Sequence, residues 1–388
     1  MRAMILAAGV GSRLAPITDI IPKPTIPVLG KPVLDRIIDL LQKHGFNEFT
    51  ANTHYLGEKI SELYQDRINI KHESDLTGVA GGIRTCADFL RAGKDSFVVI
   101  MGDALTDINL SEMLAQHKAS GRLATIAIKE VEDTTHFGVI CFDEDEKITD
   151  FQEKPRPEEA LSNWANTGVY IFEPAILDYI PSAEVYPMYD VAKDLFPDLL
   201  KLGIELNIYK TNSYWADLGT HAQYRQTLFD CLEEKFKIDI EGQKYSWGYL
   251  SDSAYLSPGC YIKGKAYIGN NSRIGRVIMK GNVIIEDNVI IEDDVVLENC
   301  LIMSNSIIKQ GCKLRDVNIK PSDEVLPIST PAQDAIEIFP LTNSSKAIAE
   351  REFKIDSEMA GINEADNKFL TFLAEASKKI NRLFVEKN

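Results

Sequence analysis

The first thirty residues place a short apolar run directly before a glycine turn. Residues 3–8 are apolar, and Gly9 and Gly11 follow with only Val10 between them. A run of this length that ends at glycine predicts a buried β-strand followed by a tight turn. Because glycine has no side chain, its backbone N–H groups can approach an anion closely. The stretch therefore predicts either an anion-binding loop or an ordinary strand and turn.

Polar and basic residues follow the glycines at once. Ser12 and Arg13 continue the loop, and Lys23 stands between Pro22 and Pro24. Arginine carries a planar donor fork that suits phosphate oxygens, and the two rigid prolines restrict where the lysine can point. These residues favour a phosphate ligand, although a pair of solvated surface cations also fits them.

Two common nucleotide-binding motifs do not fit the loop. Leu14 stands where the dinucleotide fingerprint has its third glycine, and the Gly-Lys-Ser/Thr ending of a P-loop is missing. A different mode of nucleotide binding is required if the loop holds one.

Residues 30–130 alternate between helical and strand patterns. The spacing of apolar residues predicts helices over 33–43 and 57–64 and strands over 49–53 and 96–101. Such alternation predicts an α/β domain with a mostly parallel, Rossmann-like sheet and helices on both faces. Ligands of such sheets bind at the carboxyl ends of the strands.

Several polar stretches fall where strands should end. The segment TGVAGG, residues 77–82, opens a predicted helix, and Asp103 follows the apolar strand 96–101. Further along are FGV at 137–139, EKP at 153–155 and NTG at 166–168. In isolation these fit turns, a cap or a solvated ion pair equally well.

Taken in order, these motifs resemble the signature of the sugar-1-phosphate nucleotidyltransferases, the NDP-sugar pyrophosphorylases. The resemblance rests on LAAGVGSRLAPIT, IPKPTIPVLGKPVL, the FGV, EKP and NTG succession, and WADLG at 215–219, and it spans residues 2–220. Within this family, the resemblance suggests the mannose-1-phosphate guanylyltransferase type. It departs from the family pattern at Ser12, where threonine is usual, and at Met101, where many relatives have asparagine.

The resemblance implies a role for each matching residue. The implied nucleotide contacts are Gly9, Gly11, Ser12, Glu73 and Gly78. The implied sugar contacts are Gly138, Glu153 and Asn166. The implied catalytic cations are Arg13, Lys23 and Lys154, of which Lys154 contacts the sugar phosphate. The implied ligands of Mg²⁺ are Asp103 and Asp217.

The resemblance also implies the reaction, in which an NTP and a hexose 1-phosphate form an NDP-sugar and pyrophosphate. We expect GTP with mannose 1-phosphate, and the alternative is UTP or dTTP with glucose 1-phosphate. TGVAGG is closer to guanylyl- and uridylyl-using relatives than to the glutamine-bearing thymidylyl group. A non-catalytic scaffold relative is disfavoured because the charged residues are present, and a non-sugar acceptor such as phosphocholine is disfavoured by the sugar motifs.

A different period governs residues 256–320. Apolar residues recur at every sixth position, first at Ile262, Ile268 and Ile274 and then, after one slip, at Ile285, Ile291, Leu297 and Met303. The position four residues on is also small or apolar: Ala266, Ser272, Ile278, Val289, Val295, Leu301 and Ile307. This pattern predicts a short left-handed parallel β-helix built from hexapeptides. The stretch has no histidine, which disfavours acyl transfer and favours packing or oligomer contacts.

We therefore expect three parts: a catalytic domain over 1–240, a β-helix over 256–320, and a tail over 321–388. The tail begins with four prolines between residues 321 and 340, which predict an irregular wrap. Asn363 could then cap a final amphipathic helix.

Charge and cysteine content limit the partners. The 42 basic and 58 acidic residues give a formal net charge of −16, which disfavours nucleic acid and anionic membranes. The six cysteines show no metal-ligand spacing, so we expect free thiols in the cytoplasm. Residues 1–10 resemble a signal peptide, but their apolar run is at the lower limit of length and leads directly into the charged loop, so we expect none. We expect NTP and sugar 1-phosphate as substrates and a homo-oligomer as the assembly.

Overall fold

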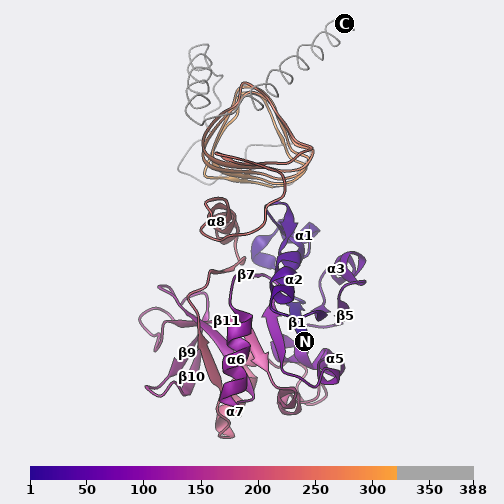
Figure 1. The fold of residues 1–388 in the computed structure, drawn as a ribbon, viewed down its shortest axis with the longest axis vertical. Coiled ribbons are helices and arrows are strands. Elements are labelled where there is room, and N and C mark those ends of the chain that lie inside the picture. Colours follow the sequence, from indigo (N-terminus) through magenta and orange to yellow (C-terminus); the bar gives the residue numbers. More distant parts are fainter. Residues whose placement is uncertain (321–388) are drawn as a thin grey trace, which may run out of the picture. The chain divides into compact units, whose positions relative to one another are not determined.

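A computed structural model of the chain describes residues 1–320, which fall into two compact units, one over Met1–Tyr224 and one from Arg225 onward (Figure 1). The predicted wrap and amphipathic helix over 321–388 lie outside the described residues. Within the described part, every helix is too short or too polar to span a lipid bilayer.

The first unit is built on a sheet of nine strands. Seven of them follow the order β10-β9-β11-β6-β1-β4-β5, and β8 pairs with both β11 and β12. Strand β1 is parallel to β4 and β6, whereas β11 is antiparallel to β6, β8 and β9. The sheet is therefore mixed, with its parallel part centred on β1, as expected for a Rossmann-like nucleotide-sugar transferase fold.

The strands of this unit are β1 (Arg2–Ala7), β2 (Pro27–Val28), β3 (Lys31–Pro32), β4 (Glu48–Thr53), β5 (Asn69–His72), β6 (Phe97–Met101), β7 (Ala104–Thr106), β8 (Ala124–Glu130), β9 (Gly138–Phe142), β10 (Ile148–Glu153), β11 (Trp164–Phe172), β12 (Asn207–Lys210) and β13 (Trp215–Asp217). The helices are α1 (Ile17–Ile20), α2 (Val33–Lys43), α3 (Gly57–Tyr64), α4 (Gly78–Thr85), α5 (Ala87–Ala92), α6 (Leu110–Ser120), α7 (Phe196–Lys201) and α8 (His221–Leu232), which continues into the second unit. Short helical turns are η1 (Ser12–Leu14), η2 (Lys23–Thr25), η3 (Pro174–Tyr179) and η4 (Val191–Leu195).

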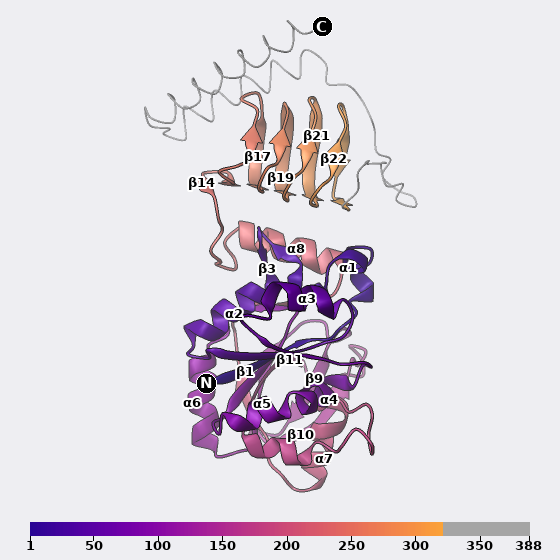
Figure 2. The same ribbon diagram turned by 90° about the vertical axis from the view of Figure 1, so that its right-hand side faces the viewer.

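Strand β1 is apolar throughout because both of its faces are covered. Met4 and Leu6 join one buried cluster with residues of β6, β8 and β11. Ala3 and Ile5, which point the other way, are also fully buried. Helices lie around the sheet (Figure 2). A strand covered on both faces has a continuous apolar sequence. The burial of β1 fixes the position at which the glycine loop begins.

The second unit carries a coiled stack of strands, which are parallel apart from the first, antiparallel pair. They are β14 (Gln243–Tyr245), β15 (Gly248–Leu250), β16 (Tyr255–Leu256), β17 (Tyr261–Ile268), β18 (Arg273–Ile274), β19 (Val277–Ile285), β20 (Ile290–Ile291), β21 (Val295–Ile302), β22 (Ile307–Ile308), β23 (Lys313–Arg315) and β24 (Asn318–Ile319). The pairs β17–β19 and β19–β21 are parallel, as are β16–β18 and β18–β20. Viewed along the stack, the coils are triangular (Figure 1). This arrangement fits the predicted β-helix.

The coil repeat differs from the prediction at four residues, of which Leu301 and Met303 are still buried and Ile278 and Ile307 are half-buried. Ile278 and Ile307 were expected inside, but the buried cluster contains their neighbours Met279 and Ile308. The register explains the difference, since Tyr261 pairs with Ile278, only 17 residues on, instead of the 18 of three hexapeptides. Met279 therefore pairs with Ile262, and Ile308 pairs with the buried Ile291, so Met279 and Ile308 take the inward positions.

Asparagines occupy the corners of the coils. Asn271, Asn288 and Asn305 all have positive φ angles, between 56° and 63°. Their side chains form a ladder in which each Nδ2 donates to the Oδ1 of the next asparagine at 3.3 Å. Asparagine tolerates this left-handed backbone better than other side chains do, so the corners stabilise the turn and the stacking together.

Candidate active site

The glycine loop leaves the carboxyl end of β1 and is held by its own neighbours. Gly11 has a φ of +69°, and a Cβ there would lie 2.9 Å from Thr18 Cγ2. The Thr18 hydroxyl donates a hydrogen bond to the Gly11 carbonyl at 3.0 Å. Gly9, Ser12 and Arg13 are at least partly exposed beside it. The loop therefore presents backbone and a guanidinium at the surface, with glycine required at position 11.

Lys23 lies in η2 and is buried, with a side chain 9% exposed. Its Nζ forms an ion pair with Asp103, and it lies 3.5 Å from Oδ1 of Asp217. One ammonium group thus contacts both of the carboxylates that were expected to hold a metal, although the three residues are far apart in the sequence.

Two strand ends bring the carboxylates together. Asp103 follows β6, and a Cβ at Gly102 would lie 2.6 Å from the Leu6 carbonyl, so only glycine fits against β1. Asp217 ends β13, which pairs with β7 in a register that sets Asp217 opposite Ala104. The Leu218 N–H then donates to the Asp103 carbonyl at 3.1 Å. Backbone pairing therefore fixes the spacing of the two acids.

Arg13 completes the cluster. A Cβ on Gly219 would lie 2.9 Å from Oδ2 of Asp217 and 3.0 Å from Nη2 of Arg13, so both groups border the same small space. Arg13, Lys23, Asp103 and Asp217 consequently surround one position at the carboxyl ends of β1 and β6.

The electrostatic balance at this position favours added positive charge. Burial raises the pKa of Asp217, and the neighbouring Asp103 raises it further, against the opposing effects of Lys23 and Arg13. Two partly buried carboxylates match the small number of protein ligands that Mg²⁺ takes when phosphate oxygens complete its shell. Residues 1–320 hold no cluster of three His, Cys, Asp or Glu side chains suited to a metal. The donor set thus fits a divalent ion shared with a phosphate.

Glu73 and Gly78, the expected base contacts, are held by internal contacts. Glu73 is 5% exposed and accepts hydrogen bonds from Asn52 Nδ2 at 2.9 Å and from Thr77 Oγ1 at 2.8 Å. Gly78 has a φ of +79°, and a Cβ there would lie 2.6 Å from the Tyr189 carbonyl oxygen. Glu73 therefore fixes the loop from within, and Gly78 allows a close approach of a second segment.

The three expected sugar contacts line one cavity of about 220 Å³. Gly138 and Glu153 face each other across the β9–β10 pair, and Asn166 projects from the neighbouring β11. A Cβ at Gly138 would lie 3.3 Å from Glu153 Oε2, so glycine keeps room beside the carboxylate. The structure thus brings together residues from three strands that are up to 28 positions apart.

Lys154 and Lys193 flank Glu153. The Nζ of Lys154 lies 3.2 Å from Glu153 Oε1, and the Nζ of Lys193 lies 3.6 Å from the same oxygen. Both lysine side chains are more than half exposed. Lys193 lines the cavity, and the sequence analysis missed it. No local pattern in the sequence marks Lys193, because its place beside Glu153 depends on a contact between residues 40 positions apart.

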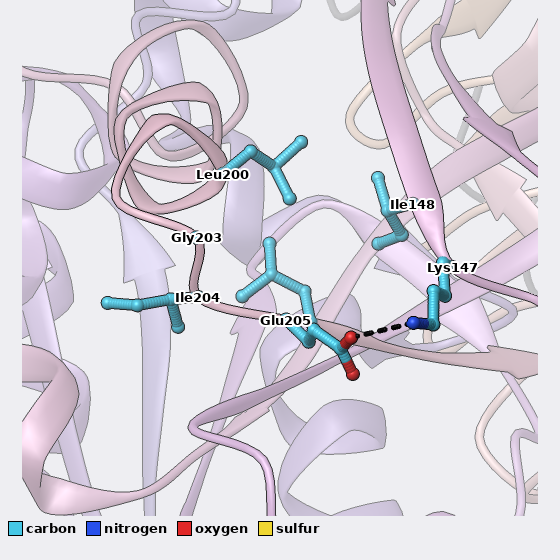
Figure 3. Close-up of a pocket in the computed structure, with 7 residues that line it drawn as sticks. Lys147, Ile148, Leu200, Gly203, Ile204 and Glu205 are labelled. Atoms are coloured by element: carbon cyan, nitrogen blue, oxygen red, sulfur yellow. Dashed lines mark ion pairs between the residues drawn. The ribbon is translucent and has the colours of Figure 1, made fainter.

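A second cavity, of about 150 Å³, lies away from all the expected site residues (Figure 3). Leu200 and Ile204 line it, and at its wall Glu205 pairs with Lys147 at 3.0 Å. Glu205 also pairs with Arg122 at 3.0 Å. Its charged groups satisfy one another, so this cavity adds nothing to the site.

Comparison with known proteins gives one family and several relatives. The family model described as "Nucleotidyl transferase" matches residues 2–234. A UTP--glucose-1-phosphate uridylyltransferase of Synechocystis sp. is 40% identical over 260 residues, covering 62% of this chain and 66% of the relative. A mannose-1-phosphate guanylyltransferase catalytic subunit beta of Xenopus tropicalis is 32% identical over 227 residues, covering 56% and 61%.

Two further matches extend the comparison. The bifunctional protein GlmU of Methanocaldococcus jannaschii is 32% identical over 256 residues, covering 63% of this chain and 57% of the relative. The matched stretch thus spans less than two thirds of each of these curated relatives. A solved Bacillus anthracis structure, described as a "Putative Glucose-1-Phosphate Thymidylyltransferase" in complex with a sucrose, has a TM-score of 0.54 at 24% identity. It covers 62% of this chain and 97% of that one, and it supports the fold.

Proposed function

We propose that this chain, which belongs to the nucleotidyl transferase family, joins UTP and glucose 1-phosphate to form UDP-glucose and pyrophosphate. The proposal depends most on one observation. Four charged residues meet beside the glycine loop, at the carboxyl ends of β1 and β6: Arg13, Lys23, Asp103 and Asp217. The family match supports the reaction class, and the expected sugar contacts line a cavity in the same unit.

The choice of UTP and glucose 1-phosphate replaces the pair favoured by the sequence alone. The relative described as a uridylyltransferase is 40% identical over 260 residues, whereas the guanylyltransferase is 32% identical over 227. This difference supports the alternative over GTP with mannose 1-phosphate. TGVAGG did not separate the two because guanylyl- and uridylyl-using relatives share it.

In the proposed reaction, a phosphate oxygen of glucose 1-phosphate attacks the α-phosphorus of UTP. A new P–O bond forms, the bond between the α-phosphorus and the β-phosphate oxygen breaks, and pyrophosphate leaves with that electron pair. The attacking phosphate is already ionised near neutral pH, so no protein base is needed. The work of the protein is to align the two substrates and to neutralise their charge.

The cations of the site offset the repulsion between the two negatively charged substrates, UTP and glucose 1-phosphate. Two unit charges of like sign 4 Å apart repel by about 4 kcal/mol at an effective dielectric of 20. We assign Arg13 and Lys23 to the triphosphate, and Lys154 with Lys193 to the sugar phosphate. Asp103 and Asp217 would hold Mg²⁺, which supplies charge neutralisation at the reacting phosphates when bound.

The remaining parts of the proposal concern the whole protein. We assign catalysis to the domain over 1–240 and packing or oligomer contacts to the β-helix over 256–320. The cysteines of the described residues are all free, which supports a reducing cytoplasmic setting. Sedimentation of the full chain tests the homo-oligomer, and a monomer at micromolar concentration would contradict it.

Pyrophosphate release tests the proposed function. The full chain is assayed with UTP, GTP, dTTP and ATP, each against glucose 1-phosphate and mannose 1-phosphate, in the presence of Mg²⁺. We expect the highest kcat/KM for UTP with glucose 1-phosphate. A higher value for GTP with mannose 1-phosphate would overturn the specificity, and no release above background with any pair would favour a non-catalytic scaffold.

A further inference from the structure

Arg84 holds a distant segment by its backbone. It lies in the last turn of α4, and its guanidinium donates to the carbonyls of Pro181, Tyr186 and Pro187 at 2.7, 3.1 and 3.4 Å. Among the described residues no carboxylate forms an ion pair with it. A planar fork with five N–H donors can serve several carbonyls at once, which a lysine ammonium on a flexible stem does less well. Arg84 is therefore arranged to fix a chain path.

The segment that it holds, residues 181–188, has weak anchors of its own. Val185, Tyr186 and Met188 are 65%, 52% and 64% exposed, so their apolar side chains contribute little burial. Inside the segment, the N–H groups of Val185 and Tyr186 donate to the Ser182 carbonyl at 3.1 and 3.0 Å. A segment with few buried apolar contacts depends on specific hydrogen bonds for its position.

Tyr189, the residue directly after this segment, joins it to residues 77–82, the loop expected to hold the base. The Tyr189 N–H donates to the Thr77 carbonyl, and the Gly81 N–H donates to the Tyr189 carbonyl, both at 2.9 Å. Glycine at position 78 leaves room for this carbonyl. Tyr189 is 5% exposed, so the junction is buried. Movement of residues 77–82 and movement of Tyr189 are therefore linked.

Beyond the junction the chain reaches the sugar cavity. The Asp190 carboxylate accepts from the N–H groups of Ala192 and Lys193 at 2.9 and 3.2 Å and so starts η4. Ala192, Lys193 and Pro197 line the cavity beside Glu153. One continuous stretch, residues 181–197, thus touches Arg84, the nucleotide loop and the sugar cavity in turn.

We propose that Arg84 is a positioning residue that couples the two substrate sites through residues 181–190, so that nucleotide bound at the loop tightens sugar phosphate binding in the cavity. The inference rests on the proposed function. Because such coupling is reciprocal, the sugar phosphate tightens nucleotide binding by the same factor. Arg84 touches neither substrate; it acts by holding the backbone that carries Lys193.

Calorimetry on the full chain tests the coupling. The affinity for glucose 1-phosphate is measured with and without a non-hydrolysable UTP analogue and Mg²⁺, and the ratio is the coupling factor. We expect a ratio of at least about 5 in the wild-type protein, within the usual range of coupling between sites. In Arg84→Gln the ratio should fall toward 1, while affinity for the analogue alone stays within about twofold.

Kinetics and matched variants separate positioning from general damage. Arg84→Gln should raise the KM for glucose 1-phosphate about tenfold at saturating UTP and change kcat less, and Arg84→Lys should lie between it and the wild type. The control is Arg91→Gln in α5, which removes an exposed arginine that pairs with Asp178 and should leave the ratio unchanged. Thermal unfolding establishes that each variant is folded.

The outcomes distinguish the coupling from the function beneath it. If the wild type binds both compounds and Arg84→Gln or Arg84→Lys keeps the full ratio, the coupling is wrong and the proposed function stands. A wild-type ratio of 1 with normal turnover also refutes the coupling. If the wild-type protein binds neither compound, the proposed function is wrong, and the coupling falls with it.

Discussion

Replacing Asp217 by asparagine should remove turnover without weakening the fold. Burial, and after it Asp103, raises the pKa of Asp217 above its ordinary value. A carboxyl group whose pKa is raised on folding holds its proton more tightly in the folded state. Stability is therefore lost as the pH rises from the unfolded pKa through the folded pKa. At neutral pH the ionised Asp217 costs stability, and an amide of the same shape removes that cost.

The magnitude follows from the geometry of the cluster. At 3.5 Å and an effective dielectric of 20, the attraction between Lys23 and Asp217 is about 5 kcal/mol. The upward direction of the pKa shows that burial and Asp103 outweigh this attraction together with that of Arg13. We expect the free energy of unfolding of Asp217→Asn to lie within about 1 kcal/mol of the wild type or above it. Turnover should fall by at least about 10³-fold, because a charge-stabilising group at the reacting phosphates is lost.

Two measurements on the same protein check this. Urea unfolding at pH 7.5 without divalent ions gives the free energy of unfolding, and pyrophosphate release with UTP, glucose 1-phosphate and Mg²⁺ gives turnover. Asp178→Asn is the matched control, since Asp178 is an exposed acid that pairs with Arg91. The reasoning is refuted if Asp217→Asn keeps near wild-type turnover, or if it loses more than about 2 kcal/mol of stability.

Three further predictions concern single residues. Lys154→Ala should raise the KM for glucose 1-phosphate about tenfold and that for UTP less than twofold, and equal increases would assign this lysine another role. Gly78→Ala should lower the free energy of unfolding in urea by at least about 1 kcal/mol more than Gly121→Ala does. Both glycines have positive φ angles, but only at Gly78 would the added Cβ lie 2.6 Å from the Tyr189 carbonyl oxygen. Equal losses in the two variants would contradict the close approach. Burial lowers the pKa of His117, so folding stability should fall as the pH drops below 6.5 toward the folded value. In His117→Gln the urea midpoint of unfolding should change less between pH 7.5 and 5.5 than in the wild type. An unchanged pH dependence of the midpoint would assign it to another residue.

Local patterns predicted the elements that position the glycine loop. Two helices begin and end where the apolar spacing placed them, at Val33–Lys43 and Gly57–Tyr64. The run from Ala3 to Ala8 became β1, Arg2–Ala7. The two helices have a clear apolar period, and β1 is a continuous apolar run that ends at Gly9, so the information that fixes these segments is local.

The segment that carries Lys193 could not be placed in this way. Its position depends on hydrogen bonds from Arg84 and on the backbone junction at Tyr189, about 100 residues from α4 in the sequence. Nothing in the spacing of residues 181–195 reveals such partners. Long-range contacts of this kind decide which loop borders which cavity.

The β-helix shows a related limit. The period was visible and one slip was placed between Ile274 and Ile285, but the six-residue spacing still assigned Ile278 and Ile307 to the interior. The step between paired strands is 17 residues from Tyr261 to Ile278 but 18 from Val277 to Val295, and the residues at the disputed positions, Ile278, Met279, Ile307 and Ile308, are all apolar. Composition alone does not distinguish Ile278 from Met279, whereas the strand register does.

The central claim is that the cluster around Lys23 and the cavity at Glu153 receive the two substrates of one reaction. A crystal structure of the full chain with Mg²⁺, a non-hydrolysable UTP analogue and glucose 1-phosphate tests it most directly. We predict the triphosphate beside Arg13 and Lys23, the metal on Asp103 and Asp217, and the sugar in the cavity. Density for the nucleotide or the sugar at any other place, with these residues still paired to one another, would contradict the account.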